Sequence, residues 1–245
     1  MNNFKKKLYE FRLLSRSVPS IVITIFVVAI FAMNLLANKS INLGINWLAL
    51  DCGFLVSWVA FLCMDVLTKH FGPKAASYLS IFAIFLNLCV SILFFLVSLI
   101  DGVWGQFFQL GEFEVVNQAL DGTLASSWYV VVGSTVALTV SSIINNTLNY
   151  VIGKLCKNKD NFLTFALRSY VSTMIAQFVD NFLFAFIVSY FFFGWSIVQC
   201  VTCAVIGMLV ELLCEVIFSP IGYRVCTKWS KDQVGKEYFE YKENV

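Results

Sequence analysis

The chain has 245 residues, of which 59% are hydrophobic and 13% are charged, and its mean hydropathy is +0.80. Soluble domains carry about 25% charged residues, so the composition excludes a soluble globular protein. The net charge of +2 is too small for the clustered basic surface that nucleic-acid binding requires, which excludes nucleic acid as a partner. The composition therefore predicts an all-α polytopic membrane protein with the lipid bilayer around it.

Six apolar segments are each long enough to cross a bilayer, which takes about 20 residues of helix. In chain order these segments are 18–37, 45–64, 75–100, 128–155, 162–193 and 197–218. The first is longer than the apolar core of a signal peptide, about 7 to 15 residues, so we interpret it as a spanning helix. The prolines lie at helix edges: Pro19 opens the first helix, Pro73 precedes the third and Pro220 ends the sixth.

The lysines and arginines predict the orientation, because positive residues near helix ends are retained on the cytoplasmic side. If the amino terminus is cytoplasmic, every basic residue except Lys39 falls on that side. The connection 101–127 then lies outside, and its charged residues are all acidic. We therefore predict three parts with both termini inside: a basic cytoplasmic segment 1–17, a six-helix transmembrane domain 18–220 and a cytoplasmic tail 221–245.

Motifs for catalysis and metal binding are not found in the sequence. Cys200 and Cys203 form a C-x-x-C, but His70 is the single histidine and no second cysteine pair completes a tetrahedral site. A phosphate-binding G-x-x-x-x-G-K-[ST] motif and a G-x-S-x-G motif are also missing. We expect no catalytic residue, no metal and no cofactor; the enzymatic alternative is an intramembrane aspartyl enzyme that pairs Asp180 with Glu211.

Polar residues recur inside the apolar segment 162–193. A charge at bilayer mid-depth costs at least about 2.5 kcal/mol, so such residues normally face a protein interior or a wet cavity. Spacings of three and four residues place the following on one helix face: Arg168, Ser172, Thr173, Gln177, Asp180 and Asn181. Twelve residues at about 1.5 Å each put Asp180 some 18 Å beyond Arg168, too far for a direct pair. We therefore predict that Asp180 lies in a cavity near mid-membrane.

Other predicted helices supply further polar groups. The acids are Asp51, Asp65, Glu211 and Glu215, and the amides include Asn34, Asn145 and Asn149. A cavity lined by carboxylates and amides suits a small planar polar solute, because carboxylates accept from N–H edges and amides bond carbonyls. The alternative is that the amides only join helices, where each contributes about 0.6 kcal/mol.

The sequence resembles the queuosine precursor transporter family, also called the vitamin-uptake-like family of six-helix bacterial membrane proteins, from Asn34 to Pro220. The pieces that carry the resemblance are NLLA at 34–37, DVLT at 65–68 with Phe71 and Gly72 after it, RSYVSTMIAQFVDNFLF at 168–184, and Glu215 ahead of Pro220. The resemblance implies uptake of 7-deazaguanine compounds or queuine across the bacterial inner membrane, for salvage into modified transfer RNA.

Three positions depart from the family's pattern. The family commonly has an acid where Lys69 stands, an aspartate where Asn145 stands, and a lysine near Glu211. An amide at position 145 both donates and accepts, whereas a carboxylate only accepts. These departures indicate that this chain prefers a different salvage intermediate.

The polar residues of the predicted helices and the resemblance together imply the site residues. The substrate is expected to contact Asp180, Gln177, Asn145, Asn34, Trp58, Asn181 and Asn149, with the Trp58 ring stacking on the base. Gating or ion coupling is assigned to Asp65, Arg168, Glu211, Glu215 and Asp51. The expected partner is a deazapurine-like base, and formation of a homo-oligomer is left open.

Two other classes of function remain open. A substrate-binding subunit of an energy-coupling-factor vitamin importer would need separate ATPase partners, and such subunits usually carry an Ala-x-x-x-Ala docking motif. That motif does not occur in this sequence, which favours a self-sufficient carrier. A structural or assembly protein of the membrane is the other alternative, and it predicts that the intramembrane amides tolerate replacement.

Overall fold

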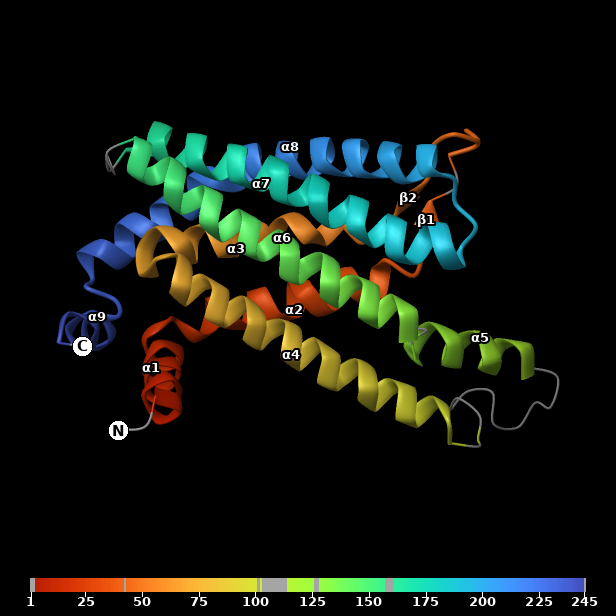
Figure 1. The fold of residues 1–245 in the computed structure, drawn as a ribbon, viewed down its shortest axis with the longest axis horizontal. Helices are drawn as coiled ribbons and strands as arrows, with labels where there is room; N and C mark the ends of the chain where they lie inside the picture. Colours follow the sequence, from red (N-terminus) through yellow and green to blue (C-terminus); the bar gives the residue numbers. More distant parts are fainter. Residues whose placement is uncertain are drawn as a thin grey trace.

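The computed structural model describes residues 3–41, 43–100, 102, 114–125, 128–156 and 161–244. Figure 1 shows an elongated bundle of long helices with α1 running across one end. The helices are α1 Asn3–Ser17, α2 Ser20–Leu36, α3 Phe54–Phe71, α4 Pro73–Ser98, α5 Glu114–Ala125, α6 Trp128–Leu155, α7 Phe162–Phe184, a π-helix Ala185–Tyr190, α8 Ile197–Lys231 and α9 Lys236–Glu243. The predicted all-α, multi-spanning membrane class is confirmed.

Within the described residues, four helices are long and apolar enough to cross a membrane by themselves: α3, α4, α7 with its π-helical end, and α8. A fifth span is possible if α1 and α2, which meet at 103°, count as one bent segment. Helices α2 and α6 coincide with the first and fourth predicted spans. The count of six spans and the orientation stay predictions, and most of the acidic connection 101–127 lies outside the described residues.

The second predicted span, 45–64, is wrong at its start. Strands β1 Ser40–Ile41 and β2 Leu50–Asp51 pair as an antiparallel hairpin, and the helix begins only at Phe54. Asp51 Oδ1 accepts a hydrogen bond of 2.7 Å from the Gly53 backbone N–H, a local bond that competes with helix formation. Gly53 follows the hairpin directly, and a Cβ at this position would lie 2.9 Å from the Met33 carbonyl oxygen, so the chain packs closely against α2 here. Asp51 therefore enters the bundle from a hairpin.

The sixth helix does not end at Pro220. Helix α8 continues through this proline to Lys231. A proline inside a helix removes one N–H donor and leaves the carbonyl four residues earlier without its usual bond. Here the Ser219 hydroxyl donates to the Val216 carbonyl at 3.2 Å, which satisfies that oxygen and lets the helix continue. The predicted tail therefore starts with helix, and the fifth predicted span likewise changes from α-helix to π-helix at Ala185.

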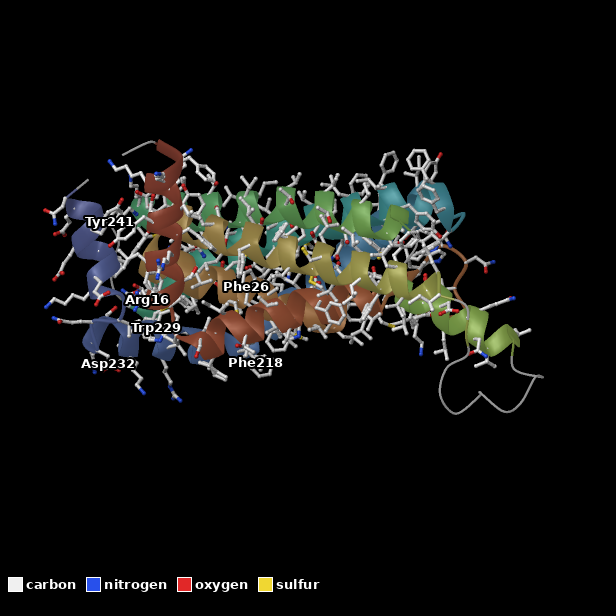
Figure 2. All side chains as sticks on the ribbon, turned by 90° about the horizontal axis from the view of Figure 1, so that it is seen from below. Arg16, Phe26, Phe218, Trp229, Asp232 and Tyr241 are labelled. Atoms are coloured by element: carbon white, nitrogen blue, oxygen red, sulfur yellow. The ribbon has the colours of Figure 1, made fainter. Side chains whose placement is uncertain are left out.

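Helices α1 and α9 pack together at the end of the bundle where both termini lie (Figure 1). We call this pair the terminal platform. The rings of Tyr9 and Tyr241 meet edge to face at 5.3 Å, and Lys74 bonds Glu10 at 3.1 Å. Figure 2 shows Tyr241 at this end of the molecule with Arg16 and Trp229. Tyr238 of α9 is fully buried, and burial raises the pKa of its phenol to about 12.

Candidate functional site

Four helices turn polar side chains into the interior of the bundle. Helices α3, α6, α7 and α8 pack against one another, and α7 lies between α6 and α8. The acids and amides on their facing stripes are buried because spacings of four residues repeat the same helix face. The acids and amides with 0% of their surface exposed are Asp65, Asn145, Asn146, Asn149, Gln177, Glu211 and Glu215, and Ser169 is buried to the same degree.

The first group is centred on Asp65 of α3. Its Oδ1 accepts from Asn145 Nδ2 of α6 at 2.7 Å, and its Oδ2 accepts from Thr173 Oγ1 of α7 at 3.1 Å and from the Ser169 hydroxyl. The same Ser169 hydroxyl lies 2.5 Å from Glu215 Oε1 of α8. One serine therefore joins two buried acids from different helices, and we call these residues the Asp65 network.

Arg168 completes this group at its edge. The guanidinium Nε donates to Asn149 Oδ1 at 2.7 Å, and the positive charge attracts the Asp65 carboxylate. A Cβ at Gly153 would lie 2.9 Å from the guanidinium, so this glycine gives the side chain its room. The sequence assigned Arg168 and Asp65 to the same gate, and in the structure Arg168 binds Asn149 and lies near enough to Asp65 for its charge to stabilise that carboxylate.

The second group lies nearer the hairpin. Asp180 Oδ1 accepts from Ser141 at 2.7 Å, and Glu211 accepts from the Ser57 hydroxyl and from Asn181 Nδ2, the latter at 2.9 Å. Asp51 contributes from β2 and is electrostatically coupled to both acids. Asp51, Asp180 and Glu211 thus bring three acids from different elements close together.

Gln177 lies on α7 between the two groups. It is one turn from Thr173 of the Asp65 network and one turn from the second group. Neither its amide nitrogen nor its amide oxygen has a hydrogen-bond partner among the described residues, although the side chain is fully buried. A buried polar group without a partner costs about 1 to 3 kcal/mol, so this amide is free to bond a water or a ligand that enters the bundle.

A small cavity adjoins the second group. Its volume is about 30 Å³, and its polar lining includes Asn34, Asp51, Ser57, Asp180 and Asn181. Since one water needs about 10 to 15 Å³ on this measure, the space suits a few waters at most. Drug-sized ligands occupy pockets of about 300 Å³ or more, so the bundle is closed around this site.

Trp58 lies apart from the cavity. Its ring stacks on Phe218 of α8 at 4.5 Å, and its indole N–H donates to the Leu55 carbonyl. Figure 2 places Phe218 at the margin of the bundle. The expected stacking of Trp58 on a bound base would require this pair to separate, so its assignment to the site stays a prediction.

Sequence reasoning missed two serines that the structure places at the centre. Ser57 binds Glu211, and Ser169 binds both Asp65 and Glu215. The signal was present, because Ser169, Thr173 and Gln177 follow one another at four-residue steps. Ser169 directly follows Arg168, and a small hydroxyl residue in that position carries no separate sequence signal of function.

The sequence was compared with protein-family models. The family model described as "Putative vitamin uptake transporter" matches residues 51–225, which is more than half of the chain. The chain belongs to this vitamin uptake transporter family. Comparison with curated proteins and with solved structures found no match. The matched region contains Asp51, α3, α6, α7 and most of α8, which together hold both polar groups of this member of the family.

The chemistry of the site fits a transporter of small polar solutes. Among the described residues, no group of three or more histidines, cysteines and acids could hold a metal ion. The side chains that converge are carboxylates, amides and hydroxyls, which can donate and accept hydrogen bonds.

Gly207 sets the position of Asn181. A Cβ at Gly207 would lie 2.7 Å from Asn181 Nδ2, so we expect Gly207→Ala to displace the amide from Glu211. Leaving this acid with one donor fewer should cost about 1 to 3 kcal/mol. The measurement is the temperature of half-aggregation in detergent for Gly207→Ala, Asn181→Ala and the double variant. The two effects should not add; additive losses would show that Gly207 acts elsewhere.

Proposed function

We propose that this protein imports a small planar nucleobase-like solute, a queuosine precursor of the 7-deazaguanine type or queuine, across the bacterial inner membrane. The proposal includes six spanning helices with both termini in the cytoplasm. It is carried by one observation, the buried amide of Gln177 without a partner in the described residues. Membership of a vitamin uptake transporter family supports transport as the activity.

The groups around Gln177 suit the edge of a deazapurine. Asp180 accepts hydrogen bonds and can take an N–H and an exocyclic amine, while a primary amide both donates and accepts. Gln177 can therefore bond a ring carbonyl and a neighbouring N–H at once. Asn181 and Asn34 line the same cavity beside Asp180 and offer further donors.

Transport requires the closed bundle to open. The cavity of about 30 Å³ is too small for a base, so solute binding must separate helices that now touch. The hairpin carrying Asp51 and the π-helix Ala185–Tyr190 lie at the same end of the bundle (Figure 1). Irregular backbone at membrane depth is tolerated where it borders a cavity, so this end is our candidate for the outer entrance.

The test is uptake of a labelled 7-deazaguanine precursor by cells that cannot make queuosine. Cells with the wild-type protein should accumulate label, and Asp180→Asn should reduce uptake to the level of the empty vector, because asparagine replaces one acceptor oxygen of the carboxylate by an NH2 donor, which opposes an N–H or amine of the solute. The control is Asp232→Asn, the same change at an exposed residue after α8, which should transport normally. Normal uptake by Asp180→Asn at equal expression would overturn the site, and no uptake by the wild type would overturn the solute.

The energy-coupling-factor subunit is the second candidate. It predicts uptake only in hosts that supply the ATPase partner subunits. The absence of an Ala-x-x-x-Ala motif from the sequence favours a carrier that works alone. Uptake in a host that lacks those subunits would exclude this candidate.

A structural or assembly role is the third candidate. It predicts that Gln177 and Asn145 can be replaced by leucine or alanine without loss of function. The polar groups of both residues have incomplete hydrogen bonding in the described part of the chain, which a purely structural amide does not need. Retained function in both variants would favour the structural role.

A further inference from the structure

The Asp65 network contains one hydrogen fewer than its contacts require if both acids are ionised. The Ser169 hydroxyl carries a single hydrogen, yet its oxygen is in close contact with Asp65 Oδ2 and lies 2.5 Å from Glu215 Oε1. One hydrogen can serve only one of these two contacts. The other contact would bring two oxygen lone pairs together in a buried site, which is repulsive. A second hydrogen must therefore lie on one of the carboxyl groups.

The donors around each acid indicate which one carries it. Asp65 accepts from Asn145, Thr173 and Ser169, and the positive charge of Arg168 attracts it. Among the described residues, Ser169 is the one hydrogen-bonding neighbour of Glu215, and Glu215 Oε2 has no hydrogen-bond partner. Three donors and a cation stabilise a carboxylate, whereas Glu215 lacks the donors that would stabilise its negative charge, and as a carboxylic acid it can donate to the Ser169 hydroxyl. Asp65 is thus the ionised member of the pair.

We propose that Glu215 holds the coupling proton of transport and shares it with Asp65 through Ser169. This inference rests on the proposed transport function and adds the driving ion. The transfer balances: Glu215 Oε1 gives its hydrogen to Ser169 Oγ, and Ser169 gives its own hydrogen to Asp65 Oδ2. Glu215 becomes the carboxylate, Asp65 becomes the acid, and the charge of the pair does not change. Movement of α8 away from α7 separates Glu215 from Ser169 and exposes the proton to one side of the membrane.

The neighbouring charges allow one proton and not a metal cation. Oxygens 2.5 Å apart leave no room for a cation between them. The groups that face the pair are Arg168 from α7, Cys63 from α3 and the neutral amide of Asn145 from α6, and Glu211 lies one turn away on α8. With Arg168 balancing Asp65, the network is neutral when Glu215 is protonated and gains a negative charge when the proton leaves.

The first arm of the test measures transport in proteoliposomes. With an acidic outer side, the wild-type protein should concentrate labelled 7-deazaguanine solute inside, and a protonophore should abolish this. Glutamine at position 215 keeps a neutral hydrogen-bond donor but cannot release a proton. Glu215→Gln should therefore still exchange solute when its concentration is equal on both sides, but should no longer accumulate solute when a proton gradient is applied. Glu240→Gln, the same change on exposed α9, should behave as the wild type. Full gradient-driven uptake by Glu215→Gln would overturn the proposal.

The second arm needs no solute and separates this proposal from the proposed function. The infrared spectrum of the purified protein at neutral pH should contain the carbonyl stretch of a protonated carboxylic acid that Glu215→Gln removes and Glu240→Gln retains. If wild-type liposomes do not exchange the deazaguanine but this band is present, the solute is wrong and the proton site stands. If Glu215→Gln leaves the spectrum unchanged, the proton site is wrong whatever the solute.

Discussion

Replacing Arg168 by alanine is expected to lower the free energy of unfolding by about 3 to 5 kcal/mol, because it leaves a buried charge uncompensated. The guanidinium attracts the Asp65 carboxylate, which is fully buried, and holds Asn149 by a hydrogen bond of 2.7 Å. A loss of this size should lower the temperature of half-aggregation in detergent by roughly 10 °C.

The matched variant is the double change Arg168→Ala with Asp65→Asn. Because asparagine carries no charge, the double variant should recover most of the lost thermal stability. Arg224→Ala, at an exposed arginine of α8, is the control and should aggregate at the wild-type temperature. If the double variant is less stable than Arg168→Ala alone, Arg168 contributes through packing and not through its charge.

Replacing Gln177 by leucine is expected to abolish most transport and to leave the protein at least as stable as the wild type. The amide has no partner among the described residues, so its removal relieves a cost of about 1 to 3 kcal/mol in the closed state. The same removal deletes the hydrogen bonds that we assign to the solute. Losing about 1.4 kcal/mol or more of binding corresponds to at least a tenfold fall in uptake at low solute concentration.

Uptake rate and aggregation temperature are measured on the same preparations of Gln177→Leu and the wild type. Gln118→Leu, at an exposed glutamine of α5, controls for the loss of an amide. A variant that transports normally would remove Gln177 from the binding site. A variant that is both inactive and much less stable would show that the amide has a structural partner in the membrane-embedded protein.

The sequence predicted the helical class and the residues of the buried stripes, because both follow from regular spacing. Segments 75–100 and 128–155 coincide closely with α4 and α6. The predicted helix ends were wrong where side-chain hydrogen bonds act on the backbone. The Asp51 side chain binds the Gly53 N–H, and α3 begins only after it. The Ser219 hydroxyl binds the Val216 carbonyl that Pro220 leaves without a donor, and α8 continues. These bonds depend on side-chain geometry, which hydropathy does not contain.

The grouping of the site residues was only partly visible from sequence. Spacing placed Gln177 and Asp180 on one face of their helix, but it could not show which helix faces that stripe. The pairing of Asp65 with Ser169, across 104 positions of sequence, depends on how α3 packs against α7. Trp58 was assigned to the site by its chemistry, and the packing turns its ring to Phe218 instead.

The terminal platform has a consequence for the order of folding during synthesis. Tyr9 of α1 and Tyr241 of α9 are in contact, although all the helices of the bundle lie between them in the chain. Contacts between residues far apart in sequence form late, because the chain must close a long loop first. Helix α1 therefore leaves the ribosome long before its partner exists, and the contact between the two helices forms only when α9 has been made. Until that moment the newly inserted bundle lacks the contact that fixes α1 across its end.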